Sequence, residues 1–328
     1  MEENYVKGRK VLVTGGAGFI GSNLIESLLS HGNHVVCLDN FSTGKRANLE
    51  GFEKLGDFKL IEGDIRDAAT CLKAAEGMDI VYHQAALGSV PRSVKDPVST
   101  TDVNIGGFVR MLFAAKECGV KRFVYATSSS VYGSSKKLPK VEEEIGTPLS
   151  PYAITKYANE LFAANFTDIY GIDVVGLRYF NVFGRRQDPE GQYAAVIPKF
   201  LMLLKQHKSP VINGDGSFSR DFTYIDNVLL ANHLAGITNN EKALNRIYNI
   251  ACGNTATLNW LFEMLRTFAG KFDKAVLDIN PEYGPVREGD IPHSHASIEK
   301  ASELLGYKPI TGVEEGLEAT VDWFWNRL

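Results

Sequence analysis

Tyr152 and Lys156 are the two residues of this sequence whose chemistry and spacing point most directly to catalysis. They lie four positions apart in SPYAITKYANELF, residues 150–162. Ser150 is a good N-cap and Pro151 suits the first helical turn, so the segment predicts a helix that presents both side chains on one face. A phenol, with a pKa of about 10, is a weak base at neutral pH, but a neighbouring ammonium favours the phenolate. The pair therefore predicts a general base that removes a proton from an alcohol.

Tyr132 and Lys136 have the same spacing. With 13 tyrosines in the chain, about one such match is expected by chance. The surrounding VYGSSKKLP favours a loop, which would not hold the two side chains together. Ser128 ends the strand before that loop, where its hydroxyl could bond the same substrate oxygen as Tyr152 or simply cap the strand end.

A glycine-rich turn near the amino end predicts a dinucleotide site. VLVTGGAGFIGSNLIESLL places Gly15, Gly18 and Gly21 between a strand and a helix. Glycine permits the tight turn and the close approach of backbone to a pyrophosphate, and the helix N-terminus offers N–H groups to phosphate oxygens. Asp39 ends the next strand, where a carboxylate accepts from a ribose hydroxyl and repels the 2′-phosphate of NADP. Its neighbour Asn40 is no arginine, so we expect NAD.

The ends of the next two strands should complete the cofactor site. Asp64 and Ile65 are expected near the adenine, although Asp64 could equally cap the following helix. Gln84, Ala85 and Ala86 are expected on the nicotinamide side of the crevice. Further cofactor contacts are expected from Phe19, Ile20, Phe41, Ser42, Gly44 and Tyr179.

The elements that must position these residues follow from hydrophobic patterning. Short runs rich in Val and Ile alternate with amphipathic windows, which predicts a Rossmann-like α/β fold with a doubly wound parallel sheet. The later sequence is richer in Gly, Pro and Arg and predicts a smaller mixed α/β lobe that binds the substrate. We expect residues 1–180 and about 223–252 to form the dinucleotide-binding domain, and residues 181–222 and 253–328 the substrate-binding domain.

Bulk composition narrows the class of partner. The 328-residue chain has a net charge of −4, so no basic field recruits nucleic acid or an anionic membrane. No segment resembles a signal peptide or a membrane span, and the four scattered cysteines fit a reducing compartment, so we expect a cytoplasmic protein. His293 and His295 lack acidic or cysteine companions at ligand spacing, so no metal is expected. His83, at a buried strand end, is expected to be a packed core histidine.

Several motifs together resemble one enzyme family. TGGAGFIG, Asp39, SSSVYG, SPYAITK, LRYFNVFGRRQ, SRDFTYIDN and REGDIPHS occur in order over nearly the whole chain. They resemble the extended short-chain dehydrogenase/reductase family, and most closely its UDP-sugar 4-epimerases, particularly those acting on UDP-N-acetylglucosamine and UDP-N-acetylgalactosamine. The resemblance implies that Ser128, Tyr152 and Lys156 form the catalytic triad and that Asn104 supports the lysine.

The resemblance also implies a mechanism. The Tyr152 phenolate would take the proton of the sugar 4-hydroxyl while hydride passes from C4 to tightly held NAD. The 4-keto sugar would then turn over, still tethered by its UDP, and hydride would return to its opposite face.

The implied UDP-sugar site lies mainly in the smaller lobe. Arg220 and Arg287 occupy motifs that the family uses for the diphosphate, where guanidinium geometry suits phosphate. Asp290 would contact the uridine ribose, and Asn181 the diphosphate or the sugar. Ser294 stands where epimerases restricted to UDP-glucose and UDP-galactose carry a tyrosine, so it leaves room for an N-acetyl group.

The remaining expected substrate residues line the sugar end of the site. They are Gly88 and Ser89 at the sugar pocket, Gln187 at the acetamido group, and Ser129, Ser130, Val196 and Asn213.

Other functions of this fold stay open. Sugar dehydratases of the superfamily carry Thr-Asp-Glu before Val-Tyr-Gly, where this chain has residues 128–130, all serine. A UDP-glucuronate 4-epimerase or decarboxylase would need a site for the C6 carboxylate, for which no dedicated residue stands out. A non-catalytic NAD(H) sensor commonly loses the tyrosine or the lysine, and a net dehydrogenase would exchange its nicotinamide in each cycle.

The oligomeric state follows only from the resemblance. The apolar faces of residues 99–118 and 152–170 could exceed what one subunit buries, and in the family such helices pair across a homodimer interface. A homodimer is therefore expected.

Overall fold

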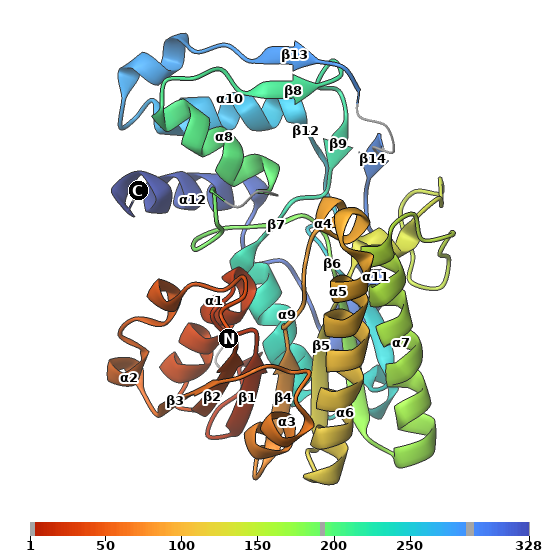
Figure 1. Ribbon diagram of the computed structural model, residues 1–328. Helices are drawn as coiled ribbons and strands as arrows, with labels where there is room; N and C mark the ends of the chain where they lie inside the picture. The colour runs from red at the N-terminus through yellow and green to blue at the C-terminus, as the bar shows by residue number, and fades with distance from the viewer. Residues whose placement is uncertain (1–3, 191–193, 287–291, 328) are drawn as a thin grey trace.

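The computed structural model describes residues 4–190, 194–286 and 292–327 and arranges them in a larger lobe, built on one sheet, and a smaller lobe beyond the carboxyl ends of its strands (Figure 1). The sheet has seven strands in the order β11-β6-β5-β4-β1-β2-β3, and each neighbouring pair is parallel. The strands are β1 Lys10–Thr14, β2 His34–Asp39, β3 Phe58–Glu62, β4 Ile80–His83, β5 Arg122–Ser128, β6 Asp173–Tyr179 and β11 Arg246–Ile250. The order reverses between β1 and β4, so a crevice is expected at their carboxyl ends.

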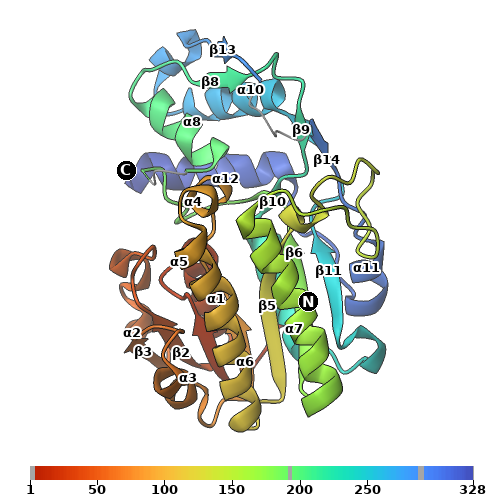
Figure 2. The same cartoon turned by 45° about the vertical axis from the view of Figure 1, so that its right-hand side comes forward.

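Helices cover both faces of this sheet (Figures 1 and 2). One face carries α1 Phe19–Ser30 and α9 Ile225–Ile237, and the other carries α3 Ala68–Ala75, α6 Phe108–Glu117 and α7 Pro151–Tyr170. Along β1, Val11 and Val13 pack into the first core and Leu12 into the second, as the two-residue period of a strand requires. Both faces are apolar because both are covered. The predicted Rossmann-like fold is confirmed.

Shorter elements connect these layers. They are α2 Phe52–Leu55, α4 Val90–Lys95 and α5 Pro97–Thr101, the 3₁₀ turns Arg46–Leu49, Ser129–Tyr132 and Glu241–Ala243, and a π-helical turn, Asp102–Gly107, between α5 and α6.

The smaller lobe combines short strands with helices, which confirms the predicted mixed lobe. Its strand groups are β10-β7, β12-β9-β14 and β13-β8. The strands are β7 Val182–Phe183, β8 Val211–Asn213, β9 Ser219–Arg220, β10 Thr223–Tyr224, β12 Ala256–Thr257, β13 Glu282–Gly284 and β14 His293–Ser294. The helices are α8 Val196–Lys205, α10 Leu258–Ala269 and α12 Val313–Arg327, with a 3₁₀ turn at Lys274–Asp278.

The chain passes between the two lobes several times. It leaves the sheet after β6, returns through β10 to α9 and β11, and leaves again after Ile250. These positions lie beside the predicted boundaries at 180, 223 and 252. One helix within the predicted 253–328 segment, α11 Glu299–Leu305, packs against β11 and α9 of the larger lobe.

His83 is a core histidine, as predicted. Its side chain is buried, its Nδ1 lies 3.0 Å from Thr14 Oγ1, and its ring packs against Phe108 and Phe123. Burial lowers the pKa of His83 to about 3, so the ring is neutral at pH 7. Within the described residues, no helix is both long enough and apolar enough to cross a bilayer.

Candidate active site

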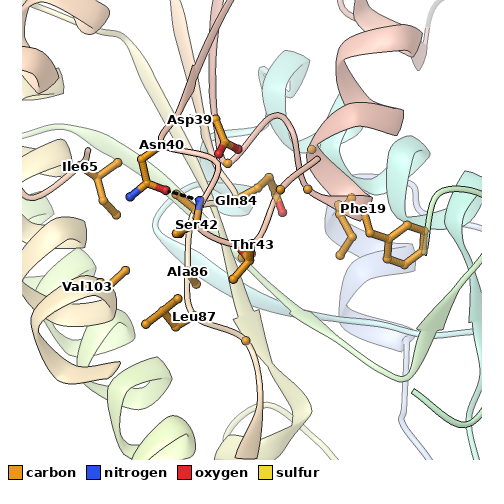
Figure 3. Close-up of a pocket in the computed structure, with 18 of the residues that line it drawn as sticks. Phe19, Asp39, Asn40, Ser42, Thr43, Ile65, Gln84, Ala86, Leu87 and Val103 are labelled. Atoms are coloured by element: carbon orange, nitrogen blue, oxygen red, sulfur yellow. Dashed lines mark hydrogen bonds between the residues drawn. The ribbon is translucent and has the colours of Figure 1, made fainter. Parts of the chain in front are cut away.

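A cavity of about 440 Å³ opens at the carboxyl ends of β1, β2 and β4, at the switch point of the sheet (Figure 3). The predicted residues that line it are Gly15, Gly18, Phe19, Ile20, Gly21, Asp39, Asn40, Ser42, Gly44, Asp64, Ile65, Gln84, Ala85, Ala86, Gly88, Ser128, Tyr152 and Tyr179. Residues widely separated in sequence therefore meet at one place, because the carboxyl ends of parallel strands lie at the same end of the sheet.

The glycine turn packs too closely for any larger residue. Gly15 has a φ of +68°, and a Cβ added to it would lie 2.7 Å from the backbone of Ala85. A Cβ on Gly21 would lie 2.2 Å from the carbonyl oxygen of Gly15. Gly18, the N-cap of α1, offers no capping side chain, so the first amides of the helix are left for an anion.

Asp39 lies at the carboxyl end of β2, on the wall of the cavity. Its carboxylate accepts from Ala17 N at 2.9 Å and from Phe41 N at 2.7 Å. A carboxylate has about four acceptor sites, so two remain for hydroxyls. Asn40 and Ser42 follow in a turn closed by Ser42 N donating to Asn40 Oδ1 (Figure 3). These groups suit the ribose end of a dinucleotide.

Asp64 does not cap the next helix, which settles one open alternative. The N-cap of α3 is Asp67, whose carboxylate accepts from Thr70 N at 3.1 Å. Asp64 instead accepts from Asn40 Nδ2 at 2.8 Å and from the backbone and guanidinium of Arg66. The Arg66 hydrogen bonds lower the pKa of Asp64 to about 2. Its charge and its bond to Asn40 shape the cavity wall.

Gln84 and Tyr179 meet a buried residue that sequence reasoning missed, Asn232 of α9. Asn232 Nδ2 donates to Tyr179 Oη at 2.9 Å, and Gln84 Nε2 donates to the same oxygen at 3.1 Å. The three side chains join β4, β6 and α9 beneath the cavity. The network therefore fixes the wall formed by Gln84 and Tyr179.

The helix predicted around Tyr152 is confirmed. α7 begins at Pro151, and Ser150 Oγ caps it by accepting from Ala153 N at 3.2 Å. Lys156 is buried, and its Nζ donates to the carbonyl of Ala126 on β5 at 2.9 Å. Burial lowers the pKa of Lys156 to about 8, while the nearby carboxylate of Glu160 opposes that shift.

The lowered pKa expected for the Tyr152 phenol, from the ammonium together with an oxidised nicotinamide, is not produced by the protein groups alone. Burial raises its pKa, and a hydrogen bond with Ser128 acts in the opposite direction. The Lys156 ammonium lies 6.0 Å from the centre of the phenol ring and is directed at the Ala126 carbonyl. Ionising the phenol therefore needs a further positive charge on the cavity side.

Asn104 lies in the π-helical turn and is buried. Its Oδ1 accepts from Leu87 N at 2.8 Å, and its Nδ2 donates to Thr155 Oγ1 at 3.1 Å. Thr155 precedes Lys156 on α7, so the amide links the cavity loop after β4 to the helix that carries the tyrosine and the lysine. The second spacing match differs: Tyr132 Oη donates to Asn249 Oδ1 at 2.6 Å in a buried position.

Most predicted substrate residues lie outside this cavity. The predicted and described residues that do not line it are Phe41, Ser89, Asn104, Ser129, Ser130, Lys156, Asn181, Gln187, Val196, Asn213, Arg220 and Ser294. Arg287 and Asp290 lie outside the described residues. Ser294 of β14 pairs with Arg220 of β9, and the Arg220 guanidinium donates to the carbonyl of Pro292 at 3.0 Å.

Sequence reasoning missed part of the cavity wall. These lining residues are Leu38, Thr43, Lys45, Asn48, Gly63, Leu87, Val103, Ala126, Thr127, Val182, Arg186 and Asp188. Lys45 Nζ donates to Asp188 Oδ1 at 2.8 Å, which joins the loop after β2 to the segment after β7. The double arginine of LRYFNVFGRRQ was a usable signal for Arg186, whose guanidinium donates to Glu26 Oε1 at 2.8 Å, because arginine is over-represented where carboxylate or phosphate is bound.

Comparisons with known proteins agree with this geometry. A family model described as the NAD dependent epimerase/dehydratase family matches residues 11–251. A protein of Methanocaldococcus jannaschii described as a putative UDP-glucose 4-epimerase is 36% identical over 318 residues, which cover 96% of this chain and 98% of that protein.

Two solved structures share the whole fold. UDP-N-acetylglucosamine 4-epimerase from Methanobrevibacter ruminantium M1, in complex with UDP-N-acetylmuramic acid, has a TM-score of 0.91 at 39% identity and covers 98% of this chain and 100% of its own. UDP-glucuronic acid 4-epimerase from Bacillus cereus, in complex with UDP-glucuronic acid and NAD, has a TM-score of 0.87 at 32% identity, with coverages of 97% and 100%.

Replacing Gly21 with alanine tests the fit of the glycine turn to a dinucleotide. The added methyl group would push α1 away from the carbonyl of Gly15, so we expect NAD affinity to fall about tenfold or more, ~1.4 kcal/mol. Calorimetric titration of the NAD-depleted protein measures this. Gly312→Ala is the matched control, since its new Cβ meets no atom within 4 Å; equal affinity of both variants would contradict the assignment.

Proposed function

We propose, on the premise that this chain belongs to the NAD dependent epimerase/dehydratase family, that it interconverts UDP-N-acetylglucosamine and UDP-N-acetylgalactosamine by inverting C4 of the sugar. The broader activity is shared by its relatives, so the chain is an NAD-dependent UDP-sugar 4-epimerase. The identity of the sugar is the new part of the proposal.

The residues of the cavity can move a proton at the sugar 4-hydroxyl. NAD, when bound, supplies the acceptor and then the donor of the hydride at C4. The Tyr152 phenolate accepts the hydroxyl proton and later returns it, and Ser128 hydrogen-bonds the same oxygen. Lys156, held by the carbonyl of Ala126, keeps a positive charge behind the phenol. Asn104 positions that helix through Thr155.

The glycine turn and the acidic strand end hold the cofactor in this proposal. The amides at the start of α1 face the pyrophosphate, and Asp39 accepts from the ribose. Gln84 and Tyr179, held by Asn232, form the wall beside the nicotinamide. These residues fit a dinucleotide because the close packing of Gly15 and Gly21, which an added Cβ would prevent, leaves the uncapped amides of α1 beside the cavity.

Ser294 is the observation that carries the choice of sugar. It lies on β14 opposite Arg220 of β9, where the diphosphate is proposed to bind. A serine there leaves volume for the acetamido group at C2, which a tyrosine would fill. The similarity to a UDP-N-acetylglucosamine 4-epimerase supports the same choice. Gly88, Ser89 and Gln187 are proposed to line the remainder of the sugar pocket.

The function is tested by incubating the purified protein with UDP-N-acetylgalactosamine and no added nicotinamide. We expect UDP-N-acetylglucosamine to form, as resolved by anion-exchange chromatography. Tyr152→Phe should slow turnover by about 10²–10⁴-fold, because it removes the proton acceptor, and should retain NAD. Turnover of UDP-glucuronate or UDP-glucose with no reaction of the acetylated sugars would reject the proposed substrate while leaving the activity class intact.

Ser294→Tyr tests the steric argument. The phenol should occupy the acetamido space and lower kcat/KM for the acetylated sugars by about 10-fold to 200-fold, the usual range for such pocket changes. UDP-glucose should lose much less. Ser294→Ala keeps the volume and serves as the control; equal losses on both classes of sugar would show that position 294 does not read the C2 substituent.

We further propose that the enzyme is a homodimer joined through α6 and α7, which lie side by side (Figure 2). Large apolar side chains stand exposed on these helices. They are Phe113, Ile154, Leu161, Phe162, Ile169 and Tyr170. An apolar surface of this kind on two packed helices is typical of a subunit interface.

Leu161→Glu tests this interface. Leu161 is 55% exposed, so a charge there is tolerated in a monomer but would be desolvated in the dimer. Sedimentation velocity should show a dimer for the unaltered protein and a monomer for the variant. Leu277→Glu, at a leucine 46% exposed in the smaller lobe, should remain dimeric. A monomeric unaltered protein would contradict the proposal.

A further inference from the structure

Asp221 is a buried carboxylate at the junction of the two lobes, outside the cavity described above. Its side chain is fully buried. Oδ1 accepts from Cys252 N at 2.9 Å, and Oδ2 accepts from Gly253 N at 3.1 Å and from Ala296 N at 3.4 Å. None of the ion pairs among the described residues includes it. Backbone amides therefore satisfy this charge.

The main chain of Asp221 is also tied to its neighbours. Its N–H donates to the carbonyl of Ser294 at 2.9 Å, and its carbonyl accepts from Asn181 Nδ2 at 2.9 Å. The carbonyl of Asn181 in turn accepts from Thr223 N at 3.3 Å. One residue thus contacts both the strand and the loop that carry proposed substrate groups.

The partners of Asp221 mark the places where the chain passes between the lobes. Asn181 follows β6, and residues 252–253 follow β11, the edge strand of the large sheet. Asp221 itself lies between β9 and β10, and Ala296 lies between β14 and α11. These four crossings belong to distant parts of the sequence, yet they meet at one residue: residues 252–253 and 296 at its carboxylate, and Asn181 at its main-chain carbonyl.

A carboxylate is chemically required for this arrangement. Burial raises the pKa of Asp221 to about 6, against the effect of the amide donors and of His295, so the group is mostly ionised at pH 7. A buried charge costs free energy unless hydrogen bonds replace its water. An asparagine would offer one acceptor oxygen and would turn its own N–H₂ toward amide donors. Only a side chain with two acceptor oxygens can accept from all three amides, which explains a buried charge at this position.

We propose that Asp221 is a positioning residue that fixes the smaller lobe relative to the catalytic phenol. The proposal rests on the function above in one respect, that Asn181, Arg220 and Ser294 hold the UDP-sugar. These residues belong to, or lie beside, the segments that hydrogen-bond to Asp221. Asp221 therefore sets the distance between the bound UDP and Tyr152. Epimerisation needs this distance twice, once for each direction of proton transfer, whereas binding of UDP alone does not need it.

Asp221→Asn in the NAD-containing enzyme tests the proposal. We expect kcat to fall at least about tenfold, since misplacement by about 1 Å is enough for such a loss. The inhibition constant of free UDP should change less than about twofold, because UDP contacts the smaller lobe without needing the phenol. Hydrogen exchange followed by mass spectrometry should show faster exchange at residues 252–253 and 296, with the strands of the large sheet still protected.

The control is Asp273→Asn, which alters a carboxylate that accepts from Ala275 N within the smaller lobe alone; its kcat should be unchanged. Turnover is measured with whichever UDP-hexose the unaltered enzyme epimerises, so an incorrect sugar assignment leaves the comparison valid. If the asparagine variant does not fold, Asp221→Ser, which places no N–H₂ against the amides, replaces it.

Two outcomes would overturn the proposal. An unchanged kcat would show that the crossings hold the lobes without this carboxylate. A parallel loss of UDP affinity and kcat would show that Asp221 only supports folding of the smaller lobe.

Discussion

The hydrogen bond from the Lys156 ammonium to the carbonyl of Ala126 is the contact on which the arrangement of the site depends. A buried ammonium loses its water, and here burial lowers the pKa of Lys156 to about 8, so an oxygen must replace that water. Ala126 lies two residues before Ser128 on β5. The bond therefore fixes α7 against β5 and, with it, the phenol of Tyr152 against the serine hydroxyl. Glu160, one turn further along α7, opposes the loss of the lysine charge.

A buried ion pair extends this frame to a third element. Arg178 of β6 donates to both oxygens of Glu160, at 2.9 and 2.7 Å, and Thr127 Oγ1 donates to the same carboxylate at 2.7 Å. Such a pair contributes little net stability, but its fixed geometry aligns α7, β5 and β6. The frame holds the Tyr152 phenol protonated, because burial raises its pKa. In the proposed reaction the phenol ionises when the cavity supplies a positive charge, so binding of the oxidised cofactor and ionisation of the phenol are expected to be coupled.

The sequence was sufficient to predict the features that are set by residues close together in the chain. The strand–turn–helix around Gly15 and the capped helix around Tyr152 are set by local patterns, and the fold follows from the alternation of such units. Contacts between distant segments carried no local signal: Asn232 lies 148 positions after its partner Gln84. The role of Asp64 stayed open because its capping of α3 depends on where that helix begins, and the local pattern did not fix the first residue, Ala68. The raised pKa of the phenol depends on burial, which motifs do not report.

In the proposed function, the two lobes separate the reaction from the choice of sugar. The family match ends at residue 251, one residue past β11, so it contains the residues to which the proposal assigns the proton transfer and the cofactor. Ser294 lies after residue 251, in the smaller lobe. If relatives that are named for different sugars share one chemistry, they must differ in this lobe. Such variation is tolerated only while the segments that connect the lobes keep their geometry. An altered sugar pocket supports the reaction only if it holds the sugar at the same distance from the Tyr152 phenol. Asp221 lies at those crossings, within the family match, and carries the contacts that keep this distance.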